Sequence, residues 1–276
     1  MYSQITKEEI TSLIKPRQPD SHKGTYGHAL LIAGSKGKMG AAVLAAKACL
    51  RTGTGLLTVN VPQKERIILQ TAIPEAMLMF RKNKIEWNKF SAMGIGPALG
   101  TSLKRLALVK AVLENFSKPL LLDADALTLL AQNKNLWSSI PAGSIITPHP
   151  AEFDRMFGTC INHDDRMNKA IILSAKYPWV IVLKNYHTLV ASRGNGCINT
   201  TGNAGLAKGG TGDILSGMVT ALLAQGYPSF NAAKIAVYLH GLAADMALTK
   251  QSMESLLATD VIECVGKAFM FTQKSQ

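Results

Sequence analysis

Residues 203–213, NAGLAKGGTGD, decide the fold of this chain, because they join a glycine-rich loop to the start of a helix. The loop is followed by apolar side chains at helical spacing: Ile214, Leu215, Met218, Val219, Leu222 and Leu223. This pattern ends at Gly226 and Pro228, so it predicts a strongly amphipathic helix that begins at the loop.

The glycine-rich loop has the properties of an anion hole. The first N–H groups of a helix lack partners within it and lie at the positive end of its dipole, so they attract phosphate. Gly209, Gly210 and Gly212 let the backbone approach an anion closely, and Thr211 completes the set. Asp213 then stands beside the hole as a base. A plain glycine-rich turn with Asp213 as an ordinary N-cap explains the same residues.

Short apolar runs rich in β-branched residues alternate with helical patterns along the chain. We predict strands at residues 29–33, 56–61, 92–95, 120–122, 144–146 and 180–183. Residues 187–191 and 196–199 are interpreted as a late hairpin. The alternation predicts an α/β fold in three layers, with a mainly parallel central sheet and helices on both faces. Ligands of such sheets bind at the carboxyl ends of the strands, where the motif loops fall.

Length and composition set limits on the class of protein. The chain has 276 residues, 47% of them hydrophobic, so it can bury a sizeable core, and we expect a single domain over residues 1–276. Residues 1–20 lack the apolar segment of a signal peptide, and no apolar span reaches membrane length, so we expect no membrane partner. Scattered cysteines favour reduced thiols and a cytoplasmic location over a zinc site or disulfides: Cys49, Cys160, Cys197 and Cys264.

The net charge of +12 is compatible with several anionic partners. Basic residues are spread along the chain, and only short clusters such as Arg81, Lys82 and Lys84 occur. Neither a basic helix nor a basic patch with interleaved aromatic residues is visible, so we expect no nucleic-acid partner. The net positive charge is sufficiently explained by a general electrostatic field that attracts nucleotides and dinucleotides.

A second glycine-rich loop, with Gly34, Gly37 and Gly40, follows the first long strand. A P-loop requires a glycine at position 32 and Ser or Thr at position 39, where this chain has Ile32 and Met39. The glycine spacing also differs from the dinucleotide fingerprint of hydride-transferring enzymes. A tight turn with small residues for close packing remains the simpler interpretation of this loop.

Six motifs occur in a fixed order along nearly the whole chain: residues 24–55, GIGPALG at 94–100, LDADAL at 122–127, TPHPAEF at 147–153, VLKN at 182–185 and GGTGD at 209–213. Together they resemble the ADP- or ATP-dependent NAD(P)H-hydrate dehydratases, which are ribokinase-like metabolite-repair enzymes. The resemblance implies a ribokinase-like fold and the ADP-dependent dehydration of (S)-NADHX and (S)-NADPHX, the hydrated forms of NADH and NADPH. It also implies Mg²⁺ as cofactor and ADP or ATP as phosphoryl donor.

The same resemblance implies a role for individual residues. Asp213 would accept the proton of the C6 hydroxyl of the hydrated nicotinamide. The substrate would contact Ala41, Gly100, His149 and Asp213. The nucleotide would contact Lys184, Asn185, Tyr186, His187, Thr188 and Gly212. Glu152 occupies the position of the acidic residue that holds Mg²⁺ in ribokinase-like enzymes, often through water. On the residues alone, Gly100 is equally well explained as a turn, and a lone histidine such as His149 is more often structural.

The chain departs from the family pattern at Ala98, Ala126 and Asn185. Asn185 tolerates left-handed φ, but Ala98 would be strained if its position requires positive φ. Asp123 and Asp125 are two residues apart after an apolar strand, which suits either a metal or hydrogen bonds to a neighbouring loop. We leave both outside the catalytic set.

Two other functions are compatible with the motifs. A ribokinase-like kinase of a vitamin-precursor alcohol, such as a hydroxymethylpyrimidine or thiazole, would keep its phosphorylated product. A non-catalytic nucleotide sensor would have no use for Asp213. Since no epimerase domain precedes Gly24, we expect functional partnership with a separate NAD(P)H-hydrate epimerase, and the resemblance suggests a homotetramer.

Overall fold

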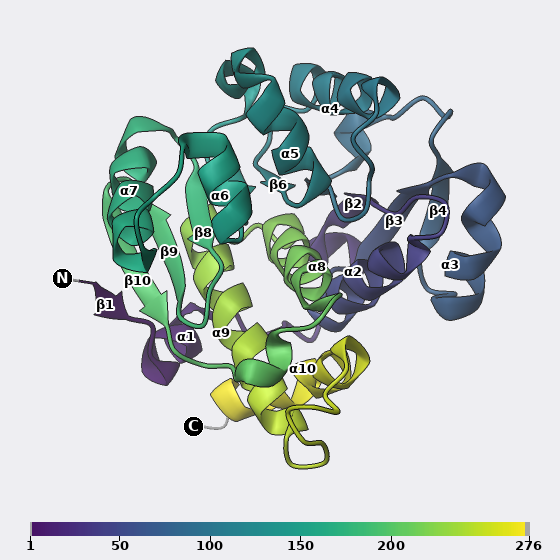
Figure 1. Ribbon diagram of the computed structural model, residues 1–276. Coiled ribbons are helices and arrows are strands. Elements are labelled where there is room, and N and C mark those ends of the chain that lie inside the picture. The colour runs from purple at the N-terminus through teal and green to yellow at the C-terminus, as the bar shows by residue number, and fades with distance from the viewer. Residues whose placement is uncertain (1, 274–276) are drawn as a thin grey trace.

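A computed structural model describes residues 2–273 of the protein. Its centre is one sheet in which the strands lie in the order β1-β10-β9-β8-β7-β6-β5-β2-β3-β4 (Figure 1). The strands are β1 (Ser3–Gln4), β2 (His28–Ile32), β3 (Leu56–Val61), β4 (Met77–Phe80), β5 (Ala92–Ile95), β6 (Leu120–Leu122), β7 (Ile145–Ile146), β8 (Val180–Leu183), β9 (Thr188–Ser192) and β10 (Asn195–Asn199). The six strands predicted from the sequence are therefore present, while β1 and β4 were not predicted.

The sheet is parallel except around β9, which runs antiparallel to both β8 and β10. Arg193 and Gly194, with φ of 50° and 77°, form the two-residue turn between β9 and β10. Two positive φ angles give a turn whose twist matches that of the strands. The predicted late hairpin is thus confirmed, with Val190 opposite Cys197.

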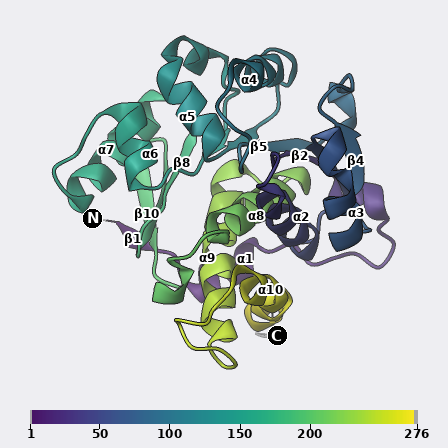
Figure 2. The same ribbon diagram turned by 45° about the vertical axis from the view of Figure 1, so that its right-hand side comes forward.

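Helices cover both faces of the sheet (Figure 2). They are α1 (Lys7–Leu13), α2 (Met39–Arg51), α3 (Arg66–Ala72), α4 (Leu103–Asn115), α5 (Asp125–Gln132), α6 (Pro150–Phe157), α7 (His163–Lys176), α8 (Thr211–Ala224), α9 (Ser229–Ala247) and α10 (Ala258–Gln273). Side chains of β2 alternate between two buried clusters: Ala29 and Leu31 join residues of α2, α8, α9 and α10, whereas Leu30 and Ile32 join residues of α4 to α7. The predicted three-layer α/β/α architecture is confirmed.

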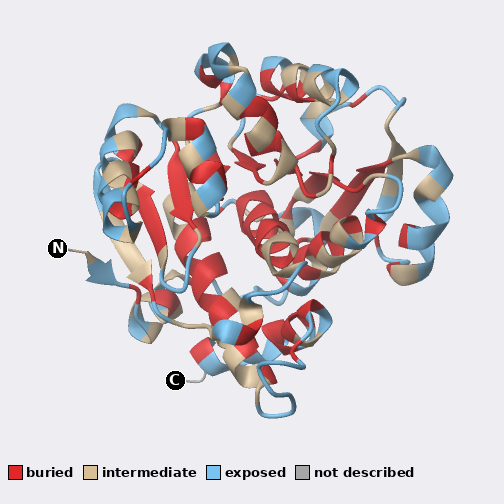
Figure 3. Cartoon of the chain, in the orientation of Figure 1, coloured by how far each residue is buried: buried red, intermediate tan, exposed pale blue. Residues whose placement is uncertain are grey.

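Helix α8 lies at the centre of its layer, and Figure 3 shows it buried along nearly its whole length. Every residue from Ile214 to Ala224 is buried, so the prediction of a strongly amphipathic helix is wrong. The side without large apolar residues packs closely against α2: a Cβ on Gly217 would lie 2.1 Å from the carbonyl oxygen of Ala45. The hydroxyl of Thr220 donates to the carbonyl of Ser216 at 2.7 Å, which satisfies it without water. This burial fixes the start of α8, and with it the glycine loop.

Over residues 2–273, no helix combines the length and the apolar character needed to cross a membrane.

Candidate active site

The predicted anion hole is the open N-terminus of α8. Its N-cap, Gly210, has φ of 97°, a left-handed conformation that suits glycine, and supplies no side-chain cap. The hydroxyl of Thr211 turns inward and donates to the carbonyls of Leu206 (2.9 Å) and Lys208 (3.0 Å). A Cβ on Gly209 would meet no atom within 4 Å. The hydrogen bonds of Thr211 therefore fix the backbone that precedes the helix, and the space beside Gly209 stays free for a ligand. An anion site requires both properties.

Asp213 lies in the first turn of α8 and is partly buried. Burial raises the pKa of its carboxyl group to about 6, the negative charges of Asp123 and Asp125 add to the shift, and the positive charge of Lys184 opposes it. A pKa close to neutral pH makes the carboxylate a stronger base than an ordinary aspartate while most of it stays ionised. The raised pKa thus suits the role predicted for Asp213.

A buried ion cluster lies beside Gly212. The ammonium group of Lys184 donates to Asp123 at 2.9 Å, lies 3.9 Å from Glu152, and would be 3.6 Å from a Cβ on Gly212. Burial disfavours its charge, but Asp123 and Glu152 outweigh this and raise the pKa of the ammonium. Lys184 is therefore a fixed positive charge beside Gly212 in the first turn of α8. The sequence pointed to Lys184 as a nucleotide contact but not to this cluster.

Asp123 belongs to the ion cluster around Lys184, although the sequence analysis did not include it among the catalytic residues. It is 2% exposed, and its second carboxylate oxygen accepts a hydrogen bond of 2.5 Å from Ser216 of α8. Asp125, two residues on, accepts the N–H of Gly100 at 2.7 Å. Both aspartates thus accept hydrogen bonds from neighbouring segments, Asp123 from α8 and Asp125 from the loop at Gly100. Of the two interpretations that the sequence allowed, a metal site or hydrogen bonds to a neighbouring loop, these contacts match the second. Asp123 follows a wholly apolar strand, and that position was the available signal for its burial.

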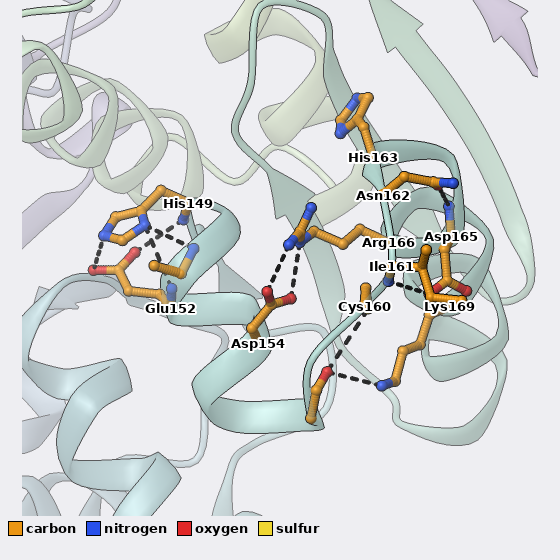
Figure 4. Close-up of polar contacts among 12 residues, drawn as sticks. His149, Glu152, Asp154, Cys160, Ile161, Asn162, His163, Asp165, Arg166 and Lys169 are labelled. Carbon is orange, nitrogen blue, oxygen red and sulfur yellow. Dashed lines mark hydrogen bonds and ion pairs between the residues drawn. The ribbon is translucent and has the colours of Figure 1, made fainter.

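His149 is the N-cap of α6 and forms a reciprocal capping box with Glu152 (Figure 4). The Nδ1 atom accepts from the N–H groups of Ala151 (3.2 Å) and Glu152 (3.4 Å), while Nε2 lies 3.4 Å from Glu152. The N–H of His149 donates to the other oxygen of Glu152 at 2.9 Å. The neutral tautomer with the proton on Nε2 satisfies all of these contacts. His149 therefore has the structural role that its residue type favours, with its ring half-exposed beside the cavity described next.

Figure 4 also shows the neighbouring ion pair of Asp154 with Arg166, which joins α6 to α7 through two contacts of 2.8 and 2.6 Å. The bidentate geometry fixes α6 on a second side. Since α6 carries both His149 and Glu152, the pair holds that end of the site in place.

A cavity of about 840 Å³ opens in front of Gly212 and Lys184. It brings together all six predicted nucleotide contacts and His149: its lining includes Lys184, Asn185, Tyr186, His187, Thr188, Gly212 and His149. The rings of Tyr186 and His187 lie 4.4 Å apart and form an aromatic rim. The lining also contains His240 of α9, which the sequence did not suggest, because its helix has the pattern of core. Burial lowers the pKa of His240 to about 4, so its ring is neutral.

The predicted substrate contacts Ala41, in the first turn of α2, and Gly100, in the loop after β5, do not line this cavity. The N–H of Gly34, in the loop before α2, donates to the carbonyl of Pro97 at 2.8 Å, which joins the two loops. Ala98 has φ of 48°, so the strain expected for alanine at this position is present. Ala126, a second departure from the family pattern, packs against the loop that contains Gly96: a Cβ added to Gly96 would lie 3.1 Å from the Cβ of Ala126.

Within residues 2–273, no three or more His, Cys, Asp or Glu side chains are grouped to hold a metal ion. Both oxygens of Glu152 face His149, so this carboxylate fits a metal through an intervening water better than by direct contact.

Comparison with known proteins identifies the family. The model of the NAD(P)H-hydrate dehydratase family matches residues 29–267, so the chain belongs to this family. Over 279 aligned residues it is 36% identical to the ADP-dependent (S)-NAD(P)H-hydrate dehydratase of Bacillus subtilis, covering 96% of this chain and 98% of that protein. The chain spans about half the length of other curated relatives, such as the bifunctional NAD(P)H-hydrate repair enzyme of Vibrio cholerae, of which it covers 51% at 37% identity.

Solved structures agree with this assignment. An ADP/ATP-dependent NAD(P)H-hydrate dehydratase from Bacillus subtilis, co-crystallised with ATP and Mg²⁺, superposes with a TM-score of 0.88 at 32% identity, covering 98% of this chain and 99% of that one. A ribokinase-like superfamily protein from Enterococcus faecalis superposes with a TM-score of 0.87 at 28% identity, covering 99% and 97%. The fold is therefore ribokinase-like, as predicted.

Proposed function

We propose that the protein catalyses the ADP-dependent dehydration of (S)-NADHX and (S)-NADPHX to NADH and NADPH. The observation that carries this proposal is Asp213, a carboxylate with a pKa of about 6 in the first turn of α8, beside open backbone N–H groups and the ammonium of Lys184. Membership of the dehydratase family supports the substrate, and the relative described as ADP-dependent supports the donor.

The reaction has two steps. Asp213 takes the proton of the C6 hydroxyl as that oxygen attacks the terminal phosphoryl group of ADP, and AMP departs. The N–H groups at the start of α8 and the charge of Lys184 stabilise the negative charge that develops on the phosphoryl oxygens. The ring nitrogen lone pair then expels inorganic phosphate from C6, and loss of a proton from the adjacent ring carbon restores the dihydronicotinamide.

The donor nucleotide is proposed to occupy the cavity lined by Lys184 to Thr188 and Gly212, with its adenine at the aromatic rim of Tyr186 and His187. ATP is the alternative donor. Mg²⁺ is proposed to accompany the nucleotide, where it would neutralise phosphate charge, and Glu152 would orient one of its waters. The structural neighbour from Bacillus subtilis was co-crystallised with ATP and Mg²⁺, which supports a nucleotide and Mg²⁺ as ligands of this protein.

On the substrate side, Ala41, Gly100 and His149 are proposed to contact the hydrated dinucleotide, with the phosphoryl acceptor oxygen between them and Asp213. A repair role implies an NAD(P)H-hydrate epimerase as functional partner, and relatives described as bifunctional repair enzymes agree with this. The homotetramer and the cytoplasmic location stay predictions.

The test is to incubate the purified protein with Mg²⁺, (S)-NADH hydrate and either ADP or ATP, and to follow the near-ultraviolet absorbance of the dihydronicotinamide. We expect nucleotide-dependent recovery that Asp213→Asn abolishes and Asp260→Asn retains, since Asp260 is also an aspartate in the first turn of a helix but lies in α10. Recovery with neither nucleotide would contradict the proposal. Stable phosphorylation of a hydroxymethylpyrimidine or thiazole alcohol would then indicate the kinase, and nucleotide binding without any turnover would indicate the sensor.

A further inference from the structure

The aromatic rim of the cavity belongs to a short exposed loop. Asn185, Tyr186 and His187 lie between β8 and β9, all three are exposed, and Tyr186 is 75% exposed. One hydrogen bond leads from this loop to a distant element, and it joins the side chain of Asn185 to His163 of α7. In the described part of the chain, the other hydrogen bonds of these three loop residues stay within residues 185–188. The position of the rim therefore depends on a single contact.

His163 is the acceptor in this contact. It is the first residue of α7, next to the N-cap Asn162 (Figure 4), and its Nδ1 atom lies 2.9 Å from Nδ2 of Asn185. Because Oδ1 of Asn185 accepts the N–H of Tyr186 at 2.8 Å, the amide turns its NH₂ group toward the ring. Burial lowers the pKa of His163, so the ring is neutral at neutral pH and Nδ1 can accept.

The stability of α7 gives no reason for a histidine at position 163. With Nδ1 as acceptor, the ring proton lies on Nε2, which is buried and has no hydrogen-bond partner among residues 2–273. A buried donor without a partner costs stability. His163 also lies outside the six motifs that run along the chain. The contact with Asn185 is the interaction that accounts for its residue type.

His163 supports the rim from outside the cavity. Its ring lies 5.8 Å from the ring of Tyr186 at an interplanar angle of 46°, and Tyr186 lies 4.4 Å from His187. The cavity lining includes Asn185, Tyr186 and His187 but not His163. A loop without this support would populate several conformations, and the apparent affinity of a ligand falls with the fraction of molecules in the binding conformation.

We propose that His163 is a positioning residue for the donor nucleotide: its hydrogen bond to Asn185 holds Tyr186 and His187 where they receive the adenine. The proposal rests on the proposed function, which places the nucleotide in this cavity, and adds a residue outside the contacts assigned there. It also explains one departure from the family pattern. Asn185 does not have positive φ, so the amide side chain and its bond to His163, not the backbone conformation, give this residue its role.

The experiment measures KM for ADP and kcat, with Mg²⁺ and saturating (S)-NADH hydrate, in the wild type, His163→Ala, Asn185→Ala and the double variant. For His163→Ala we expect KM for ADP to rise about two- to tenfold, as for the loss of one hydrogen bond. The value of kcat should be retained, because Asp213 and Lys184 are untouched. Since the two side chains act as a unit, His163→Ala should change KM little in the background of Asn185→Ala.

Asn168→Ala is the matched control. Asn168 also lies in α7, and its Oδ1 atom accepts the hydroxyl of Tyr2 at 2.6 Å, so this substitution likewise removes a hydrogen bond between α7 and another segment. Neither Asn168 nor Tyr2 lines the cavity. A purely structural role of His163 predicts the same KM for ADP in both variants. We expect KM to rise in His163→Ala and to stay at the wild-type value in Asn168→Ala.

The proposal is overturned if the wild type is active and KM for ADP is unchanged in His163→Ala, or rises equally in Asn168→Ala. It is also overturned if the effects of His163→Ala and Asn185→Ala on KM multiply in the double variant. If the wild type shows no dehydratase activity, the proposed reaction fails instead, and titration calorimetry with ADP and Mg²⁺ decides on His163. Weaker ADP binding in His163→Ala than in Asn168→Ala supports the positioning role, whereas equal binding in both, or none by the wild type, overturns it.

Discussion

Replacing Asp213 by asparagine should stabilise the protein while removing its turnover. The folded structure raises the pKa of this carboxyl group from 3.8 to about 6, mainly by burial and then through the charge of Asp123, so ionisation of Asp213 opposes folding. The shift corresponds to about 3 kcal/mol at most. Because Asp213 is partly exposed, solvent screening reduces this to about 1 kcal/mol, or a rise in melting temperature of about 2–4 °C for a chain of this size.

The sign of the pH dependence follows from the same values. In the unfolded chain the group ionises near 3.8 and in the folded protein near 6, so the wild type loses stability as the pH rises through this window. Asparagine does not titrate. The difference in melting temperature between Asp213→Asn and the wild type should therefore be small at acid pH and reach its full value above about pH 6.

Thermal unfolding followed by circular dichroism at several pH values measures this difference, with Asp260→Asn as the control for the loss of one charge. In parallel, loss of a general base should reduce kcat by about 10²- to 10⁴-fold, and wild-type activity should fall below about pH 6 as Asp213 becomes protonated. A lower melting temperature for Asp213→Asn at neutral pH, or a difference that does not change with pH, would refute the reasoning.

Three other substitutions test the packing around the site. Ala98→Gly should stabilise the protein by about 1 kcal/mol in urea denaturation, because it relieves a φ of 48°. Gly217→Ala should destabilise it by about 1–3 kcal/mol or prevent folding, since the new Cβ would lie 2.1 Å from a carbonyl oxygen of α2. His149→Ala should cost about 1 kcal/mol through loss of the α6 cap, and should raise KM for the hydrated dinucleotide.

The sheet was predictable wherever a strand is buried on both faces. In β2, β5, β6 and β8 the contacts with two helical layers require an almost uninterrupted apolar run, and such a run is visible in the sequence. Strand β4 lies at the edge of the sheet and is only partly buried; its run MLMF is apolar but contains no β-branched residue, and the sequence analysis did not predict it. Strand β1 has two residues, too few for any periodicity.

The site was predictable where its parts are close in sequence. The glycines and Asp213 form one local unit. The capping box of His149 and Glu152 is also local, but the sequence analysis assigned these two residues to substrate and metal instead. The role of Asp123 depends instead on Lys184 and Ser216, which are 61 and 93 residues away. Small polar residues of α8 misled the sequence analysis for a related reason, because Ser216 and Thr220 resemble a solvent-facing side until their buried partners are known.

The charges around Lys184 are compatible with a base and an anion site at one helix terminus, as we propose for α8. Three carboxylates, those of Asp123, Glu152 and Asp213, act on a single ammonium group. Asp123 and Glu152 hold that ammonium in place, and Asp123 also raises the pKa of Asp213. Asp123 therefore both helps to hold the positive charge of Lys184 beside α8 and raises the pKa of the proposed base Asp213. Since a donor polyphosphate adds still more negative charge, the cation that offsets it must arrive with the nucleotide, which is the role proposed for Mg²⁺.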